Sequence, residues 1–166
     1  MIDFSIVHSI DRSLLFLKRL IAGAEFWAML TAKGKYGLKA LVYLATLEAN
    51  STAHGNEIAK ASNISKKFLD AILSELRNAG IVKSKRGPGG GYMLARSPRA
   101  IKAGFVIRTL DGPLAPIACA SRTAYRPCRD CKSVANCEVR RTMALVRDAT
   151  ANVLDKLSIA DMIKKR

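Results

Sequence analysis

Apolar residues recur with a helical period between residues 55 and 80, and a short polar turn near Asn63 interrupts them. The first of the two helices is expected to begin near Asn56 or Glu57. The second is predicted to start after Ser65, whose hydroxyl can cap free backbone N–H groups. It should end at Gly80, because glycine accepts the left-handed conformation. Its apolar stripe comprises Phe68, Leu69, Ile72, Leu73 and Leu76.

The pattern after Gly80 changes to that of two short strands. Residues 81–86 ("IVKSKR") and 92–96 ("YMLAR") have strand character, and "GPGGG" joins them. A hairpin tip with almost no side chains fits a narrow DNA groove. A glycine-rich nucleotide-binding loop would need a helix after it, whereas a strand follows here. Helix, turn, helix and hairpin together predict a winged helix.

Two further helices follow from the spacing of apolar residues. Apolar residues follow helical spacing from Lys35 on, which predicts the first helix. The second helix, near the C-terminus, has a heptad seam of the kind that packs along a partner helix. We therefore expect a homodimer, although the same stripe would also suit a core-facing helix within one subunit. The seam residues are Val139, Met143, Val146, Thr150, Val153 and Leu157.

The net charge of +15 adds a candidate partner. Residues 1–28 are neutral overall, so the surplus lies in residues 29–166. Nucleic acid is the first candidate for an acidic partner and an anionic membrane surface the second. Combined with the winged-helix pattern, the charge predicts contacts with double-stranded DNA. The predicted DNA-binding residues are Ser65, Lys66, Lys67, Lys85, Arg86, Gly89, Gly90 and Tyr92.

The N-terminal segment resembles neither a membrane span nor a signal peptide. Its apolar run is cut by Lys18 and Arg19, and acidic Asp3 and Asp11 stand where a basic region belongs. We interpret residues 1–28 as an upstream extension and Met29 as the natural start. The alternatives are a membrane-surface helix or an extra helix on the domain. No membrane association and a cytoplasmic location are therefore expected.

All four cysteines lie between residues 119 and 137. Clustered thiols in the reducing cytosol indicate metal binding or redox chemistry rather than structural disulfides. We predict an iron–sulfur cluster first, with a thiol/disulfide switch and a zinc site as the alternatives. The Cys128–Cys131 CxxC also permits a thiol oxidoreductase, but that enzyme class would want a βαβ pattern, which is missing.

The stretch "EIAKASNISKKFLDAILSELR" followed by "AGIVKSKRGPGGGYMLAR" resembles the Rrf-type (Rrf-two) family of bacterial transcription regulators. This resemblance covers residues 29 to about 162 and implies a dimeric repressor that senses iron, redox state or nitric oxide through a 2Fe-2S or 4Fe-4S cluster. It also implies three cysteine ligands, of which the last two are separated by five residues. Cys119, Cys131 and Cys137 match that pattern. Cys128 is an alternative second ligand, a fourth ligand or a spare thiol.

The sequence departs from the family at two positions. Arg140 stands where some members have a histidine ligand, and Lys35 where others have an aspartate from the partner subunit. The expected fold is mainly α with a small β-wing, a winged helix-turn-helix plus a long C-terminal dimerisation helix. Its parts are a winged-helix domain (29–100), a connecting helix with the cysteine loop (101–137), and the dimerisation helix and tail (138–166).

Overall fold

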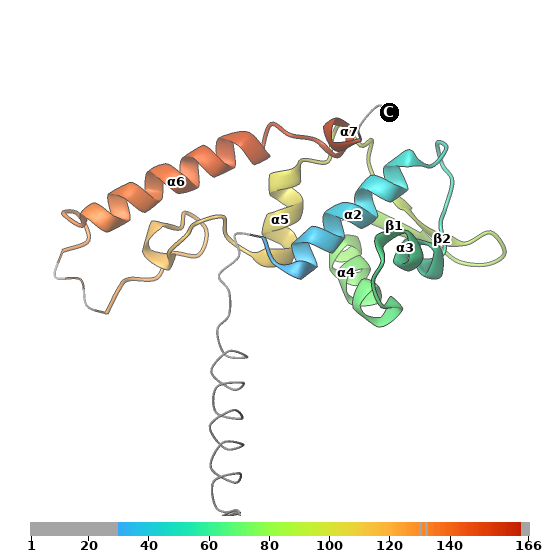
Figure 1. Cartoon of the computed structure of the whole chain (residues 1–166), viewed down its shortest axis with the longest axis horizontal. Helices are drawn as coiled ribbons and strands as arrows, with labels where there is room; N and C mark the ends of the chain where they lie inside the picture. The colour runs from blue at the N-terminus through green and yellow to red at the C-terminus, as the bar shows by residue number, and fades with distance from the viewer. Residues whose placement is uncertain (1–29, 130, 132, 164–166) are drawn as a thin grey trace, which may run out of the picture.

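The computed structural model of the chain describes residues 30–129, 131 and 133–163 (Figure 1). The predictions for residues 1–28 and Met29 lie outside this part of the chain. Helix α2 (Ala32–Thr46) occupies the centre of the fold and contacts helices α3, α4, α5 and α7. It contributes Leu38, Leu41 and Leu44 to the core. The predicted mainly helical architecture with a two-stranded wing is confirmed.

Helices α3 (Gly55–Ser62) and α4 (Lys66–Asn78) form the helix-turn-helix. The turn between them is possible because Asn63 adopts the left-handed conformation, with φ of 55°. Ser65 caps α4 as predicted, since its hydroxyl accepts a hydrogen bond from the backbone N–H of Phe68 at 3.3 Å. Gly80 follows the helix with φ of 69°, also as predicted. The four buried residues of α4 are Leu69, Ile72, Leu73 and Leu76.

Strands β1 (Val82–Lys85) and β2 (Gly91–Leu94) form the antiparallel wing, with Val82 opposite Leu94. A third segment supports the base of the wing. Ala53 and Tyr92 exchange two backbone hydrogen bonds, of 3.0 and 2.8 Å. The loop before α3 is therefore fixed to β2, so the wing and the helix-turn-helix have a defined relative position.

The C-terminal part leaves the winged-helix domain and then returns to it (Figure 1). Helix α5 (Ala103–Asp111) leads away to the short 3-10 helix η1 (Ala118–Ala120), and α6 (Glu138–Leu154) begins at the far end and runs back toward the winged-helix domain. Helix α7 (Ile159–Met162) then packs on α2. Among the described helices, none is both long and apolar enough to cross a membrane.

One detail of the C-terminal prediction is wrong. Leu157 was expected to continue the heptad seam, but α6 ends at Leu154. The backbone carbonyl of Leu157 accepts a hydrogen bond from Ala103 at 2.9 Å, and the N–H of Ile159 bonds the carbonyl of Ile101 at 2.9 Å. These bonds to the start of α5 stop the helix and direct Leu157 toward the core.

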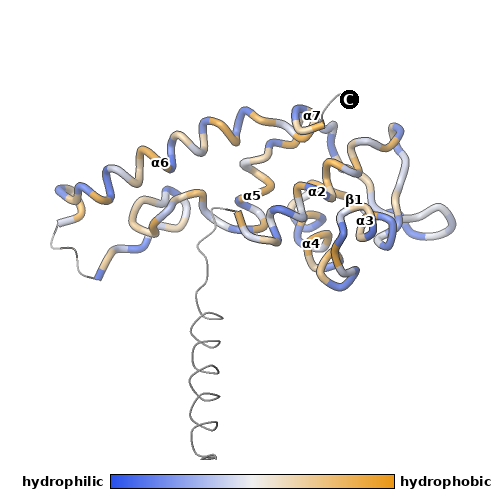
Figure 2. The backbone as a smooth tube through the Cα atoms, viewed as in Figure 1, coloured by the Kyte–Doolittle hydropathy of each residue, from blue (hydrophilic) through white to orange (hydrophobic). Residues whose placement is uncertain are grey.

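The remaining seam residues lie on a helix that buries none of its side chains. Val139, Val146 and Val153 are 63%, 41% and 65% exposed. The backbone trace of α6 alternates between hydrophobic and hydrophilic positions along its length (Figure 2). Met143 and Thr150 are half-buried, so the described part of the subunit covers this apolar face only in part.

Candidate DNA-binding surface and cysteine site

The exposed N-terminal end of α4 carries three of the predicted DNA-binding residues, Ser65, Lys66 and Lys67. The Nζ of Lys66 forms an ion pair with Asp70 at 2.6 Å. The hydrogen bond to Asp70 and its charge raise the pKa of Lys66. Because this ammonium already has a carboxylate partner, Lys67 is the better candidate for binding a phosphate. The backbone N–H groups at the start of the helix add a positive dipole end.

The predicted wing residues divide into an exposed group and a structural group. Lys85, Arg86 and Gly89 are exposed at the tip. Gly90 is buried, and a Cβ there would lie 2.5 Å from the carbonyl oxygen of Lys85. Tyr92 is half-buried against the core. Gly90 and Tyr92 therefore shape the wing, and the exposed group is available to a ligand.

Thr52 supports the wing tip, and the sequence did not single it out. Its hydroxyl donates to the carbonyl oxygen of Gly89 at 2.8 Å and lies 3.4 Å from that of Gly90. A lone threonine in a loop gives no periodic signal. The one hint is that Thr52 precedes helix α3, which lies beside the predicted hairpin.

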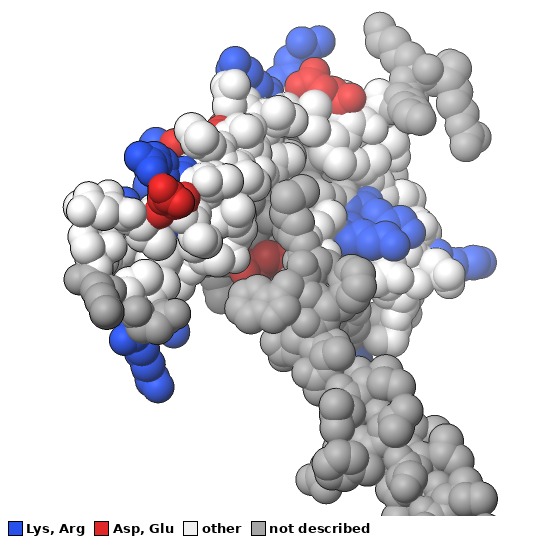
Figure 3. Space-filling model, turned by 60° about the vertical axis from the view of Figure 1, so that its left-hand side comes forward, with Lys and Arg blue, Asp and Glu red and all other residues white. Residues whose placement is uncertain are grey.

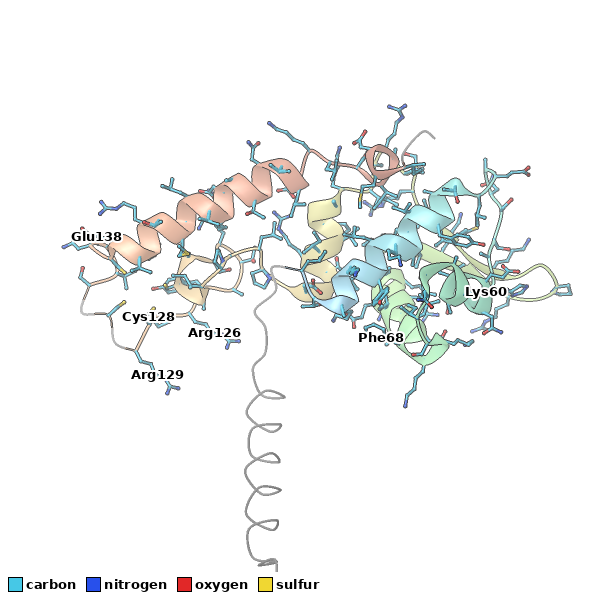
Figure 4. All side chains as sticks on the ribbon, viewed as in Figure 1. Lys60, Phe68, Arg126, Cys128, Arg129 and Glu138 are labelled. Carbon is cyan, nitrogen blue, oxygen red and sulfur yellow. The ribbon has the colours of Figure 1, made fainter. Side chains whose placement is uncertain are left out.

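The cysteine segment lies at the opposite end of the molecule from the helix-turn-helix and wing (Figure 4). It begins at η1, where Cys119 is buried with 3% of its surface exposed. The Cys119 carbonyl oxygen accepts a hydrogen bond from the Arg140 side chain at 2.9 Å, and the Ala120 carbonyl accepts one from Arg147. Both arginines belong to α6, so this helix holds η1 in place.

The neighbouring thiol of Cys128 is the main cause of the raised pKa of Cys119, and burial raises this pKa further, as does the nearby Cys137. Cys119 is therefore protonated at neutral pH, and a protonated thiol is a poor nucleophile. Cys128, which the sequence left as an alternative second ligand, a fourth ligand or a spare thiol, is the neighbour that affects the pKa of Cys119 most.

Cys137 is the N-cap of α6, and its sulfur accepts a hydrogen bond from the backbone N–H of Arg140 at 3.4 Å. Cys128 and Cys131 are both half-buried. Four thiols are the donors that iron–sulfur clusters and zinc prefer. In the described part of the chain, however, no three Cys, His, Asp or Glu side chains already form a group that could hold a metal ion. The donor set fits such a group by its chemistry, and the loop would have to close around it.

Charge is distributed over the whole molecule rather than confined to the wing. Lys and Arg side chains form several separate groups on the face that Figure 3 shows, with few Asp or Glu among them. Arg126 and Arg129 lie beside Cys128 in the cysteine segment (Figure 4). Basic side chains therefore lie near both candidate sites.

Comparison with known proteins agrees with this arrangement. A family model described as "Rrf2: Iron-dependent Transcriptional regulator" matches residues 30–165. A putative HTH-type transcriptional regulator, rrf2-like, from Rhodobacter capsulatus is 42% identical over 138 residues, which are 81% of this chain and 92% of the relative.

Two solved structures are similar in both sequence and fold. CymR, described as the global cysteine regulator of B. subtilis, is 36% identical with a TM-score of 0.66, and the match covers 81% of this chain and 95% of CymR. IscR from T. potens is 32% identical with a TM-score of 0.63, covering 81% of this chain and 85% of IscR.

Proposed function

The chain belongs to the Rrf2 family of transcriptional regulators, and on that basis we propose that it binds operator DNA through α4 and the wing, under the control of an iron–sulfur cluster on the cysteine segment 119–137. A member of this family is a regulator and not an enzyme. The thiol oxidoreductase alternative is therefore set aside. DNA binding itself follows from the family, whereas the contact residues and the cluster are our proposal.

One observation carries the DNA-binding proposal. The start of α4, with Ser65 and Lys67 exposed, lies in the same domain as a glycine-rich tip that carries Lys85 and Arg86. A helix in the major groove and a wing in the adjacent minor groove would place all four residues against DNA. Phosphate contacts from the cations fix the position of the protein on the duplex.

The test uses an operator selected from a random-sequence pool. Affinity should fall steeply with salt, because phosphate contacts release counterions. Lys67→Ala should weaken specific and non-specific binding alike and lower the salt slope by about one per subunit. The matched control is Lys156→Ala, which removes an exposed cation after α6. Equal effects of the two substitutions would contradict the proposed surface.

For the cluster, we propose Cys119, Cys131 and Cys137 as ligands, with Cys128 as the fourth. Cys131 and Cys137 have the separation of the family's last two ligands. Arg140 and Lys35 stand where other members supply a histidine or an aspartate, which leaves a coordination position that the Cys128 thiol can take. When bound, such a cluster supplies a redox- and oxygen-sensitive charge beside α6.

A second candidate is a disulfide switch between Cys119 and Cys128, which the neighbouring position of the two thiols favours. Oxidation by an alkyl hydroperoxide would join the two sulfurs, and the peroxide would leave as the alcohol and water. The two thiols thereby lose two protons and two electrons. In this mechanism Cys131 and Cys137 are not required.

Serine substitution at each cysteine separates the two mechanisms. Under anaerobic purification with iron and sulfide analysis, loss of Cys119, Cys131 or Cys137 should abolish the visible absorption of the cluster. Cys128→Ser should retain part of it. If no variant and no parent protein holds iron, and only Cys119→Ser and Cys128→Ser abolish the response to peroxide, the disulfide mechanism replaces the cluster.

We also propose that the protein is a homodimer formed through α6. The support is the exposed apolar face of this helix, which includes Val139, Val146 and Val153. Two copies would bury these side chains together and place two α4 helices on successive turns of DNA.

A further inference from the structure

The short helix η1 is only three residues long, yet its carbonyl groups and that of Ile117 before it all have a hydrogen-bond donor. Backbone N–H groups bond the carbonyls of Ile117 and Ala118. A helix leaves its last carbonyl groups without backbone partners. Here Arg140 and Arg147 supply the missing donors, to Cys119 and Ala120 respectively.

Arg140 also contacts a second cysteine. Its backbone N–H bonds the sulfur of Cys137 at 3.4 Å, while its side-chain Nε bonds the carbonyl oxygen of Cys119 at 2.9 Å. One residue therefore joins two thiol-bearing residues that are 18 positions apart in the chain. It is not a metal ligand itself, because a guanidinium has five donors and no acceptor.

Arg147 lies two turns further along the same side of α6. Only 15% of its side chain is exposed, and its guanidinium pairs with Asp148 through two contacts of 2.8 Å. Asp148 in turn pairs with Arg122 of the cysteine segment at 3.1 Å. These contacts fix the guanidinium that holds Ala120, so η1 has a second attachment to α6.

We propose that Arg140 is a positioning residue that holds Cys119 against the first turn of α6, with Arg147 as the second attachment, so that a change in the bonding of the thiols is transmitted to α6. The proposal rests on the regulatory role of the cysteines. Its physical basis is that the backbone of Cys119 cannot shift without either moving α6 or breaking the bond from Arg140 to the Cys119 carbonyl oxygen. Charge-assisted hydrogen bonds are the strong ones, so moving α6 is the expected outcome.

The sequence allows a direct test, because trypsin places each cysteine in a separate peptide. Cleavage after Arg108, Arg122, Arg129, Lys132 and Arg140 separates Cys119, Cys128, Cys131 and Cys137, and the bond between Arg126 and Pro127 resists cleavage. The reduced, metal-free full chain is pulsed with iodoacetamide, digested, and analysed by mass spectrometry. This reports the alkylation rate of every thiol in the same molecule.

Arg140→Gln should raise the alkylation rate of Cys119 by about tenfold, because the buried thiol opens more often once the charged donor is lost. The alkylation rate of Cys131 should change by less than about twofold, because the lost donor bonds the backbone of Cys119. Arg140→Lys keeps the charge and should show a smaller increase. The control is Arg141→Gln, an exposed neighbour on the same turn.

An unchanged Cys119 rate in Arg140→Gln would overturn the proposal, and so would an equal rise at all four cysteines, which is the result of general loosening. A DNA-binding measurement separates this proposal from the function. If the Cys119 rate responds as expected but serine variants bind the operator as the parent does under all redox conditions, the attachment exists and the regulatory role of the thiols fails.

Discussion

Two side chains in this protein fix short stretches of backbone outside the main helices and strands. Thr52 does so for the wing tip and Arg140 for the cysteine segment. In both cases a side chain donates to carbonyl groups that no backbone N–H of the described residues is found to bond. The residues that would contact DNA or a cluster therefore depend on neighbours that contact neither.

Thr52→Val removes the hydroxyl that bonds Gly89 while keeping the shape of the side chain. We expect operator affinity to fall about three- to tenfold, in line with the loss of one hydrogen bond. The thermal midpoint should change little, since the wing tip is exposed. Thr52→Ser restores the hydroxyl and should restore affinity. If serine and valine bind alike, the hydroxyl does not position the wing.

Among the elements, α2 depends on close contact with α5. A Cβ at Gly37 would lie 2.2 Å from Cδ1 of Leu110, whereas a Cβ at Gly55, at the start of α3, would meet only ordinary contacts at 3.6 Å or more. Alanine at Gly37 should therefore destabilise the protein by about 1–3 kcal/mol. Alanine at Gly55 should be neutral or stabilise it by up to about 1 kcal/mol. Urea unfolding measures both, and equal effects would contradict this packing.

A second contact between elements gives a pH dependence. Arg108 of α5 binds Asp155, just after α6, through both carboxylate oxygens at 2.6 and 2.9 Å, and this lowers the pKa of Asp155 from its ordinary 3.8. A lowered pKa in the folded state means that the pair stabilises the fold above about pH 4, and that this contribution is lost as the pH falls below that value.

Asp155→Asn should thus reduce the free energy of unfolding at pH 7 by less than about 1 kcal/mol, because the pair is partly exposed. The difference from the parent should shrink toward pH 3. Arg108→Gln in the Asp155→Asn background should add almost nothing, since the partner is already absent. A difference that persists unchanged at pH 3 would show that the ion pair is not its source.

The elements differ in how far the sequence predicts them. Helix α4 and the wing were predictable, because Ser65 and Gly80 mark helix ends and the glycine run marks a hairpin. The return of residues 157–159 to α5 was not, because it depends on backbone bonds between segments more than 50 residues apart. The thiol neighbour of Cys119 was equally out of reach, since residues 120–136 have no periodicity from which to infer which thiols meet.

At the scale of the whole molecule, the two sites lie at opposite ends, and α6 carries both the attachments of the cysteine segment and the apolar face that we propose as the dimer interface. The apolar face of α6 and the side that carries Arg140 and Arg147 are about 100° apart around the helix axis. A single helix can therefore hold the cysteine segment and a second subunit at the same time. This geometry supports the proposed coupling between thiol chemistry and the spacing of two α4 helices.

Val146→Asp or Val153→Asp should convert the dimer to a monomer, because a charge in an apolar interface is left desolvated and unpaired. Operator affinity should then lose the gain that comes from linking two binding sites. Asn152→Asp is the matched control, an exposed position on the opposite side of α6. Sedimentation velocity measures the oligomeric state of each variant. A Val153→Asp variant that remains dimeric would place the interface elsewhere.

The attachment of Cys119 to Arg140 also bears on how the cysteine segment can change during evolution. With its two ends held together, residues 120–139 form a closed loop whose length does not set the position of α6. Doubling the length of such a loop costs only about 0.6 kcal/mol. Insertions or deletions between Cys119 and Cys131 can therefore accumulate without shifting the start of α6. The spacing between Cys119 and Cys131 is therefore the part of the segment in which a change of length costs least.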